Sequence, residues 1–69
     1  MYYRVYAKFN GQKQFKPLDL SQGTQVTNLM YATLVPAENL GKLKEAIQGQ
    51  DNAKIEIREA ETGKTIFSI

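Results

Sequence analysis

The stretch that decides the fold is Tyr2-Tyr-Arg-Val-Tyr-Ala-Lys-Phe9, in which two kinds of side chain alternate. Alternate residues of a β-strand point to opposite faces of a sheet, so the pattern predicts a strand over residues 2–9. The more apolar set forms a core face, made of Tyr3, Val5, Ala7 and Phe9. The other set forms an aromatic and basic face directed away from the core, made of Tyr2, Arg4, Tyr6 and Lys8.

Asn10-Gly11 follows this strand and marks a hairpin. A two-residue loop at 10–11 places Phe15 opposite Tyr6, on the polar face. A three-residue loop over Phe9–Gly11, with Gly11 left-handed, places Phe15 opposite Val5 instead. We expect the three-residue loop, because it buries Phe15.

Two more strands are expected before the middle of the chain. The second covers about residues 13–20, and Pro17 places it at a sheet edge or a bulge because proline cannot donate to a ladder. The third covers about residues 26–35. Both of its faces are apolar, which is typical of a central strand.

A helix is expected from Pro36, since proline suits the first helical turn. Gly49 is a favourable stop, and Gly41 inside the helix suggests a close approach to the sheet. One apolar stripe follows the helical period, made of Leu40, Leu43 and Ile47.

The last part of the chain predicts a hairpin with a three-residue loop at 61–63. Its register places apolar residues opposite each other, pairing Ile57 with Phe67 and Ile55 with Ile69. We therefore expect the substitution Phe67→Ala to cost ~3–5 kcal/mol of stability.

These elements define one small α+β domain over residues 1–69. Its sheet is antiparallel-rich, with about five strands and one helix packed on one face, in the order β-β-β-α-β-β. The expected core consists of Tyr3, Val5, Phe15, Leu34, Leu40, Leu43, Ile47, Ile55, Ile57 and Phe67.

Composition removes most catalytic chemistry, because the 69 residues include no histidine and no cysteine. The chain lacks an imidazole base, a thiol nucleophile and the usual zinc ligands. We expect no enzyme activity, no catalytic residue, no metal and no cofactor. No apolar run reaches the length of a membrane span, so the expected location is the cytoplasm, without membrane contact.

The candidate binding residues are the outward face of the first strand and two lysines nearby in sequence, namely Tyr2, Arg4, Tyr6, Lys8, Lys13 and Lys16. Lysine on an exposed strand also protects against aggregation, so a plain solvated surface is the first interpretation. A protein interface is the second, because Tyr and Arg are enriched in interfaces. Nucleic acid is the third, with tyrosines stacking on bases and cations meeting phosphates.

Charge is uneven along the chain, whose net charge is +2. Residues 1–35 carry four basic residues against one acidic residue, and residues 36–69 carry five against six. This excess is mild for a DNA-binding domain. The leading expectation is a non-enzymatic binding module for a protein partner or a second copy of itself, and the alternative is nucleic-acid binding.

The segment from Asn28 to Ile47, followed by Ala53-Lys-Ile-Glu-Ile-Arg-Glu59, resembles small uncharacterised bacterial and phage α+β domains. The resemblance implies a bacterial or mobile-element origin and supplies no catalytic residue. Three strands followed by a helix is also similar to the arm-binding domains of phage and transposon integrases, which lay a sheet in the DNA major groove. The extra hairpin at residues 53–69 departs from that plan.

Overall fold

Strand β1 (Tyr2–Phe9) is the centre of the sheet, because both of its edges are paired. Along one edge it pairs antiparallel with β5 (Ala53–Glu59) over nearly its whole length. Its other edge pairs with two short strands. β4 (Val35–Pro36) pairs with the first residues of β1, and β2 (Lys16–Asp19) pairs with Tyr6 and Ala7.

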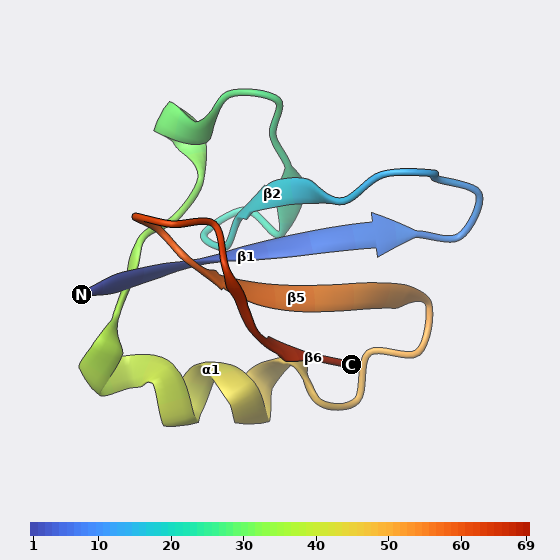
Figure 1. Cartoon of the computed structure of the whole chain (residues 1–69). Coiled ribbons are helices and arrows are strands. Elements are labelled where there is room, and N and C mark those ends of the chain that lie inside the picture. Colours follow the sequence, from blue (N-terminus) through green and yellow to red (C-terminus); the bar gives the residue numbers. More distant parts are fainter.

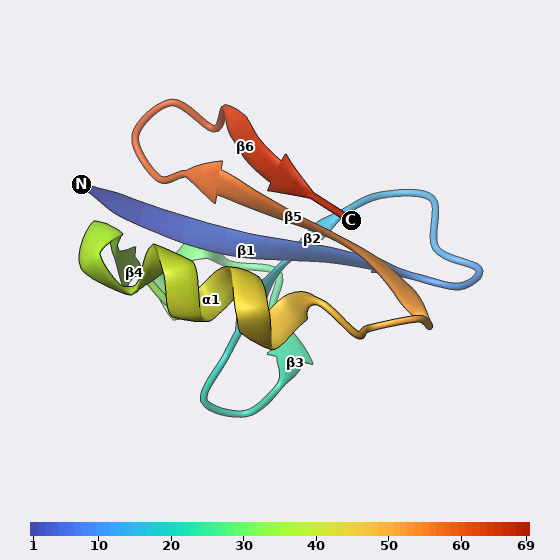
Figure 2. The same ribbon diagram turned by 90° about the horizontal axis from the view of Figure 1, so that it is seen from below.

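The computed structural model describes every residue from 1 to 69. The sheet order is β3-β2-β1-β5-β6, with β4 beside β1. Helix α1 packs across one face, and no helix covers the other (Figures 1 and 2). The remaining elements are β3 (Thr24–Gln25), β6 (Thr65–Ser68), α1 (Leu40–Ile47) and the 3-10 turns η1 (Leu29–Tyr31) and η2 (Ala37–Asn39).

The core lies between the sheet and α1. Val5 and Ile57 face each other across β1 and β5, and neither side chain is accessible to solvent. Burying a side chain of this size stabilises a fold by about 1.5–3 kcal/mol. The other buried members of the cluster are Tyr3, Ala7, Leu18, Val35, Leu43, Ile47 and Ile55.

Several predictions are confirmed. The first strand covers residues 2–9, and the expected α+β architecture is present. Ile57 pairs with Phe67, and the N–H of Ile69 donates to the carbonyl of Ile55 at 3.0 Å. Leu40 and Phe67 pack on the core while remaining half-buried.

The predicted position of Phe15 is wrong. A tight turn at Asn10-Gly11 does form, since the Gln12 N–H donates to the Phe9 carbonyl at 3.0 Å and the Gln12 side chain accepts from the Phe9 N–H at 2.9 Å. The ladder does not continue from this turn, because the next pair is Ala7 with Lys16, and the connection is therefore longer than two or three residues. Strand β2 therefore begins at Lys16 instead of residue 13. Tyr6 pairs with Pro17, and this register directs Phe15 away from the core.

The predicted central strand over residues 26–35 is also wrong. The Asn28 side chain accepts a hydrogen bond from the Met30 N–H at 2.9 Å and starts the turn η1. Asparagine offers the backbone this local alternative to a strand ladder. Leu34, expected in the core, is 47% exposed, and only Val35–Pro36 join the sheet at β4.

Gly41 does not approach the sheet. It is exposed, and a Cβ placed there would have no neighbour within 4 Å. The helix packs through its apolar stripe alone, with Leu43 and Ile47 buried.

Candidate binding surface

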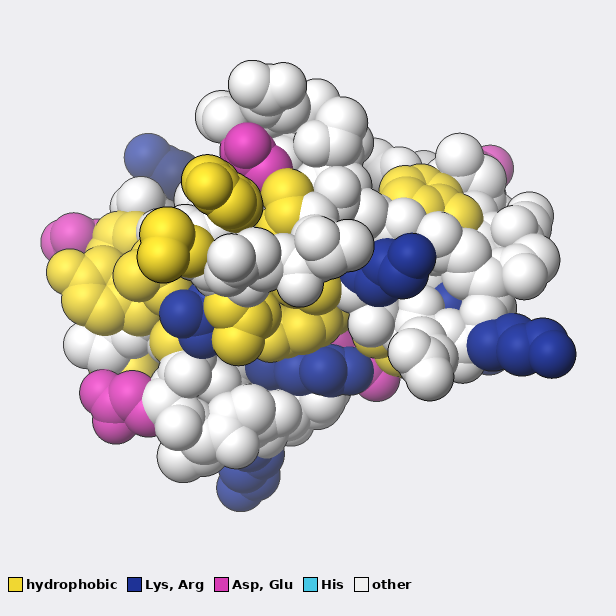
Figure 3. All heavy atoms as spheres, turned by 90° about the horizontal axis from the view of Figure 1, so that it is seen from above, with side chains coloured by type: hydrophobic (Ala, Val, Ile, Leu, Met, Phe, Trp, Pro, Cys, Tyr) yellow, Lys and Arg dark blue, Asp and Glu magenta, His cyan; other side chains and the backbone are white.

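The sheet face opposite α1, which we call the open face, carries the outward half of the β1 pattern. Figure 3 views the molecule from this side. Hydrophobic side chains gather over one half of the view, and Lys and Arg side chains lie among them and toward the other half. The β1 residues directed to this face are Tyr2, Arg4, Tyr6 and Lys8.

The two sides of β1 differ in character on the open face. On the β4 and β2 side, Pro36 stands opposite Tyr2 and Pro17 opposite Tyr6. Continuing these registers places Leu34 beside Arg4 and Phe15 beside Lys8, so this side is apolar. On the β5 side, the residues opposite Arg4, Tyr6 and Lys8 are Arg58, Glu56 and Lys54.

Arg58 organises the middle of the open face. Its guanidinium lies 4.1 Å from the ring centroid of Tyr6 and 5.5 Å from that of Phe15. The same guanidinium donates twice to Glu56 Oε1, at 2.7 and 2.9 Å, and the Lys8 ammonium lies 5.1 Å from Phe15. Each contact is worth about 1 kcal/mol or less at a half-exposed site. Together these contacts leave five side chains of the open face partly buried, although no other element packs over them. They are Tyr6, Lys8, Phe15, Glu56 and Arg58.

Arg4 is tied to the neighbouring hairpin. Its Nη1 donates to the carbonyl of Ala60 at 3.2 Å, while its Nε is enclosed and has no hydrogen-bond partner in the chain. Arg4 also faces Arg58 across the strand pair. This guanidinium is therefore held toward the hairpin between β5 and β6.

Four of the seven exposed large hydrophobic side chains lie in or just after the turn η1, which leads into β4 beside the start of β1. In Figure 1 the turn η1 (green) rises on the side away from α1. Met30 is 80% exposed and Tyr31 is 65% exposed, while Ala32 is buried and anchors the turn. We call this group the apolar turn; it consists of Leu29, Met30, Tyr31 and Leu34.

The six predicted binding residues do not form one group. Four of them lie together on the open face, namely Tyr2, Arg4, Tyr6 and Lys8. Lys16 pairs with Ala7, whose side chain is in the core, so Lys16 leaves the sheet on the α1 side. Lys13 and Lys16 instead line a shallow hollow with Gln12 and Gln14 in the loop before β2.

Sequence reasoning missed Lys54 and Arg58, whose place beside β1 depends on a long-range strand pairing. It also missed the apolar turn, since those residues were assigned to a strand. The signal available in the sequence was Asn28, a residue that favours turns.

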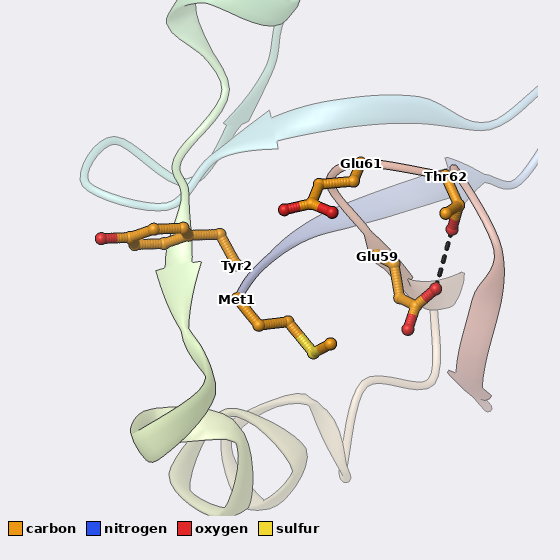
Figure 4. Close-up of a pocket in the computed structure, with 5 residues that line it drawn as sticks. All are labelled: Met1, Tyr2, Glu59, Glu61 and Thr62. Atoms are coloured by element: carbon orange, nitrogen blue, oxygen red, sulfur yellow. Dashed lines mark hydrogen bonds between the residues drawn. The ribbon is translucent and has the colours of Figure 1, made fainter.

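A second hollow, of about 210 Å³, lies where β1 begins (Figure 4). Two carboxylates line it, and Glu59 Oε1 accepts a hydrogen bond from the Thr62 hydroxyl at 2.7 Å. The Tyr2 ring points away from both carboxylates, past β4. Nowhere in the fold do three or more His, Cys, Asp or Glu residues gather as metal ligands would.

The pKa of the Asp19 carboxyl departs from its ordinary value. The pKa is lowered because the Ser21 hydroxyl and N–H donate to its Oδ1, at 2.6 and 3.0 Å. Asp19 ends β2 and caps the turn that follows, so this shift belongs to a structural turn.

Comparison with known proteins finds no family model, no curated protein and no solved structure that matches this chain. The resemblance to bacterial and phage domains therefore stays an expectation from the sequence. No helix combines the length and the apolar character that crossing a bilayer requires. The function must be argued from the surface itself.

Proposed function

We propose that this domain is a non-enzymatic binding module for another protein, and that the open face and the apolar turn form its contact surface. The observation that carries the proposal is the apolar turn, where four large apolar side chains within six residues are between 47% and 80% exposed. Contiguous exposed apolar surface in a small domain marks an interaction site. The neighbouring Tyr2, itself 51% exposed, and Arg4 are of the types that dominate interface energies.

A different protein fits this surface better than a second copy of the chain. A two-fold dimer brings the same patch of both subunits together. On the open face that contact would bring a surface with four cations and one carboxylate on β1 and β5 against itself, so cations would meet cations. Like charges facing each other across an interface oppose binding.

Nucleic acid is the second candidate, supported by the two pairs of cations that face each other on β1 and β5, Arg4 with Arg58 and Lys8 with Lys54. The stacking part of this function is less well supported. The Arg58 guanidinium already lies over Tyr6 and is bonded to Glu56. Three of the four side chains of the apolar turn, Leu29, Met30 and Leu34, also have no polar group to offer a phosphate backbone.

The test is selection of displayed random peptides against the purified domain. We expect recovered peptides to lose binding to the double variant Met30→Ser/Tyr31→Ser. The matched control is Glu45→Ser/Ala46→Ser, which changes two exposed residues of α1 on the opposite side. All four positions are exposed, so both variants should keep the parent stability within about 0.5 kcal/mol.

Two results would contradict the proposal. One is the failure to recover any peptide that depends on the apolar turn. The other is equal loss of binding in the α1 control. Salt-sensitive binding of single-stranded oligonucleotides, unchanged in the Met30→Ser/Tyr31→Ser variant, would favour the nucleic-acid function instead.

A further inference from the structure

We infer that the partner of the open face is an acidic protein segment that also carries apolar side chains. This inference rests on the proposed function and gives the chemistry of its partner. The β1 and β5 strands direct four cations to the open face, and Glu56 is the one carboxylate they direct there. The cations are Arg4, Lys8, Lys54 and Arg58.

Glu56, the one carboxylate that β1 and β5 direct to the open face, already has hydrogen-bond partners in the chain. Glu56 accepts both hydrogen bonds from Arg58 and a third from the Thr65 hydroxyl at 3.2 Å. Asp19, at the end of β2, is engaged with Ser21 in its own turn. Lys8 and Lys54 therefore have no acidic partner in the chain, since the Arg58–Glu56 pair is the one salt bridge in the fold.

The cations also face each other directly. Arg4 stands opposite Arg58, and Lys8 stands opposite Lys54. Like charges at directly opposed strand positions destabilise a sheet. A carboxylate placed between the two members of a pair relieves that repulsion, so an acidic partner gains more on binding than a neutral one.

The spacing of the charges constrains the partner further. Arg4 and Lys8 are separated by four residues of one strand, which is about 13 Å. Tyr6, covered by Arg58, lies between them. The complementary ligand therefore has two acidic groups about 13 Å apart, separated by apolar contact; four residues of extended chain span that distance.

The apolar side of the open face decides between an acidic protein and a nucleic acid. Pro17, Pro36 and the Leu29, Met30 and Leu34 side chains of the apolar turn offer no hydrogen-bond donor or charge to a phosphate, and the Tyr31 hydroxyl is the one side-chain donor among these residues. A peptide that alternates acidic and apolar residues matches both sides at once. Phosphates match only the β5 side.

The test measures fluorescence anisotropy with synthetic peptides of equal length and apolar content whose charged positions are Glu, Gln or Lys. We expect the Glu peptide to bind about 10-fold more tightly than the Gln peptide, as two or three half-exposed ion pairs would provide. The Lys peptide should bind most weakly. The preference for Glu should shrink as salt is raised.

The variant Lys8→Gln/Lys54→Gln should remove the Glu preference while the domain still binds the Gln peptide. Its matched control is Lys42→Gln/Lys44→Gln, which changes the net charge equally but lies on α1. We expect this control to keep the preference, because the attraction is local. Loss of the preference in both variants would mean that net charge alone attracts the peptide, and would overturn the inference.

The remaining outcomes separate this inference from the proposed function. If Gln or Lys peptides bind as tightly as the Glu peptide, and all lose binding in Met30→Ser/Tyr31→Ser, the protein-binding function stands and the acidic partner is wrong. If none of the peptides binds, both are wrong. Tighter binding of a single-stranded oligonucleotide than of the Glu peptide overturns the acidic segment in favour of nucleic acid.

Discussion

The substitution Ile57→Val removes a single carbon atom and tests how tightly the core is packed. Ile57 is fully buried and lies between Val5 on β1 and Phe67 on β6. Shortening a side chain at such a site removes one methylene from the packed cluster and leaves a small void. The expected cost is about 0.5–1.5 kcal/mol. For a domain of this size, each kcal/mol lowers the melting temperature by about 4–8 °C.

The comparison variant is Leu34→Ala, which removes more atoms from a side chain that is 47% exposed. Because Leu34 lies outside the buried cluster, we expect its truncation to change stability by about 0.5 kcal/mol or less. The larger deletion should therefore cost less than the smaller one. Thermal and urea unfolding of both variants, followed by circular dichroism, measure this order.

The refuting result is a reversed order. If Leu34→Ala lowers stability more than Ile57→Val does, residues 26–35 contribute to the core as a central strand, and the placement of η1 is wrong. A changed urea slope in either variant, with an unchanged midpoint, would instead report an altered unfolded state.

Two glycines should respond to alanine with opposite signs. Gly41 is an exposed helical residue with free space around it, so Gly41→Ala should stabilise the fold by up to about 1 kcal/mol; Gly63 has φ of +76° in the β5–β6 turn, so Gly63→Ala should cost about 1–2 kcal/mol. Thermal melts measure both, and equal shifts would contradict the backbone assignment. The substitution Ser21→Ala should raise the pKa of Asp19 toward its ordinary 3.8, measured by carboxyl NMR titration. Because folding lowers this pKa, Asp19 stabilises the fold above pH 3.8 and loses that contribution as the pH falls through the folded-state pKa; an unchanged Asp19 pKa in the variant would show that Ser21 does not cause the shift.

The strands β1 and β5 could be predicted because each has one buried face. Tyr3 and Val5 alternate with Arg4 and Tyr6, so only one register buries the apolar set. Residues 26–35 are apolar on both faces, and alternation there does not distinguish a strand from an exposed turn. The local hydrogen bond of Asn28 decided the outcome.

The candidate site could be predicted only in part, for a different reason. The β1 half followed from alternation within one strand. Lys54 and Arg58 could not be added, because no local pattern shows that β5 lies beside β1. Lys13 and Lys16 are close to β1 in sequence, but Lys13 lies in the loop before β2, and the pairing of Lys16 with Ala7 directs Lys16 to the α1 side.

The pairing of β1 with β5 also governs how this chain acquires its structure. The ribosome makes residues 2–9 well before residues 53–59, the strand that pairs with them over the greatest length. Until then one edge of the central strand has no partner, and β2 and β4 can pair only with its other edge. Long-range pairing of this kind slows folding, because the intervening chain must be closed into a loop before any contact compensates. A nascent chain halted before residue 53 therefore lacks the main partner of β1 and exposes an unpaired strand edge, which makes it prone to aggregate.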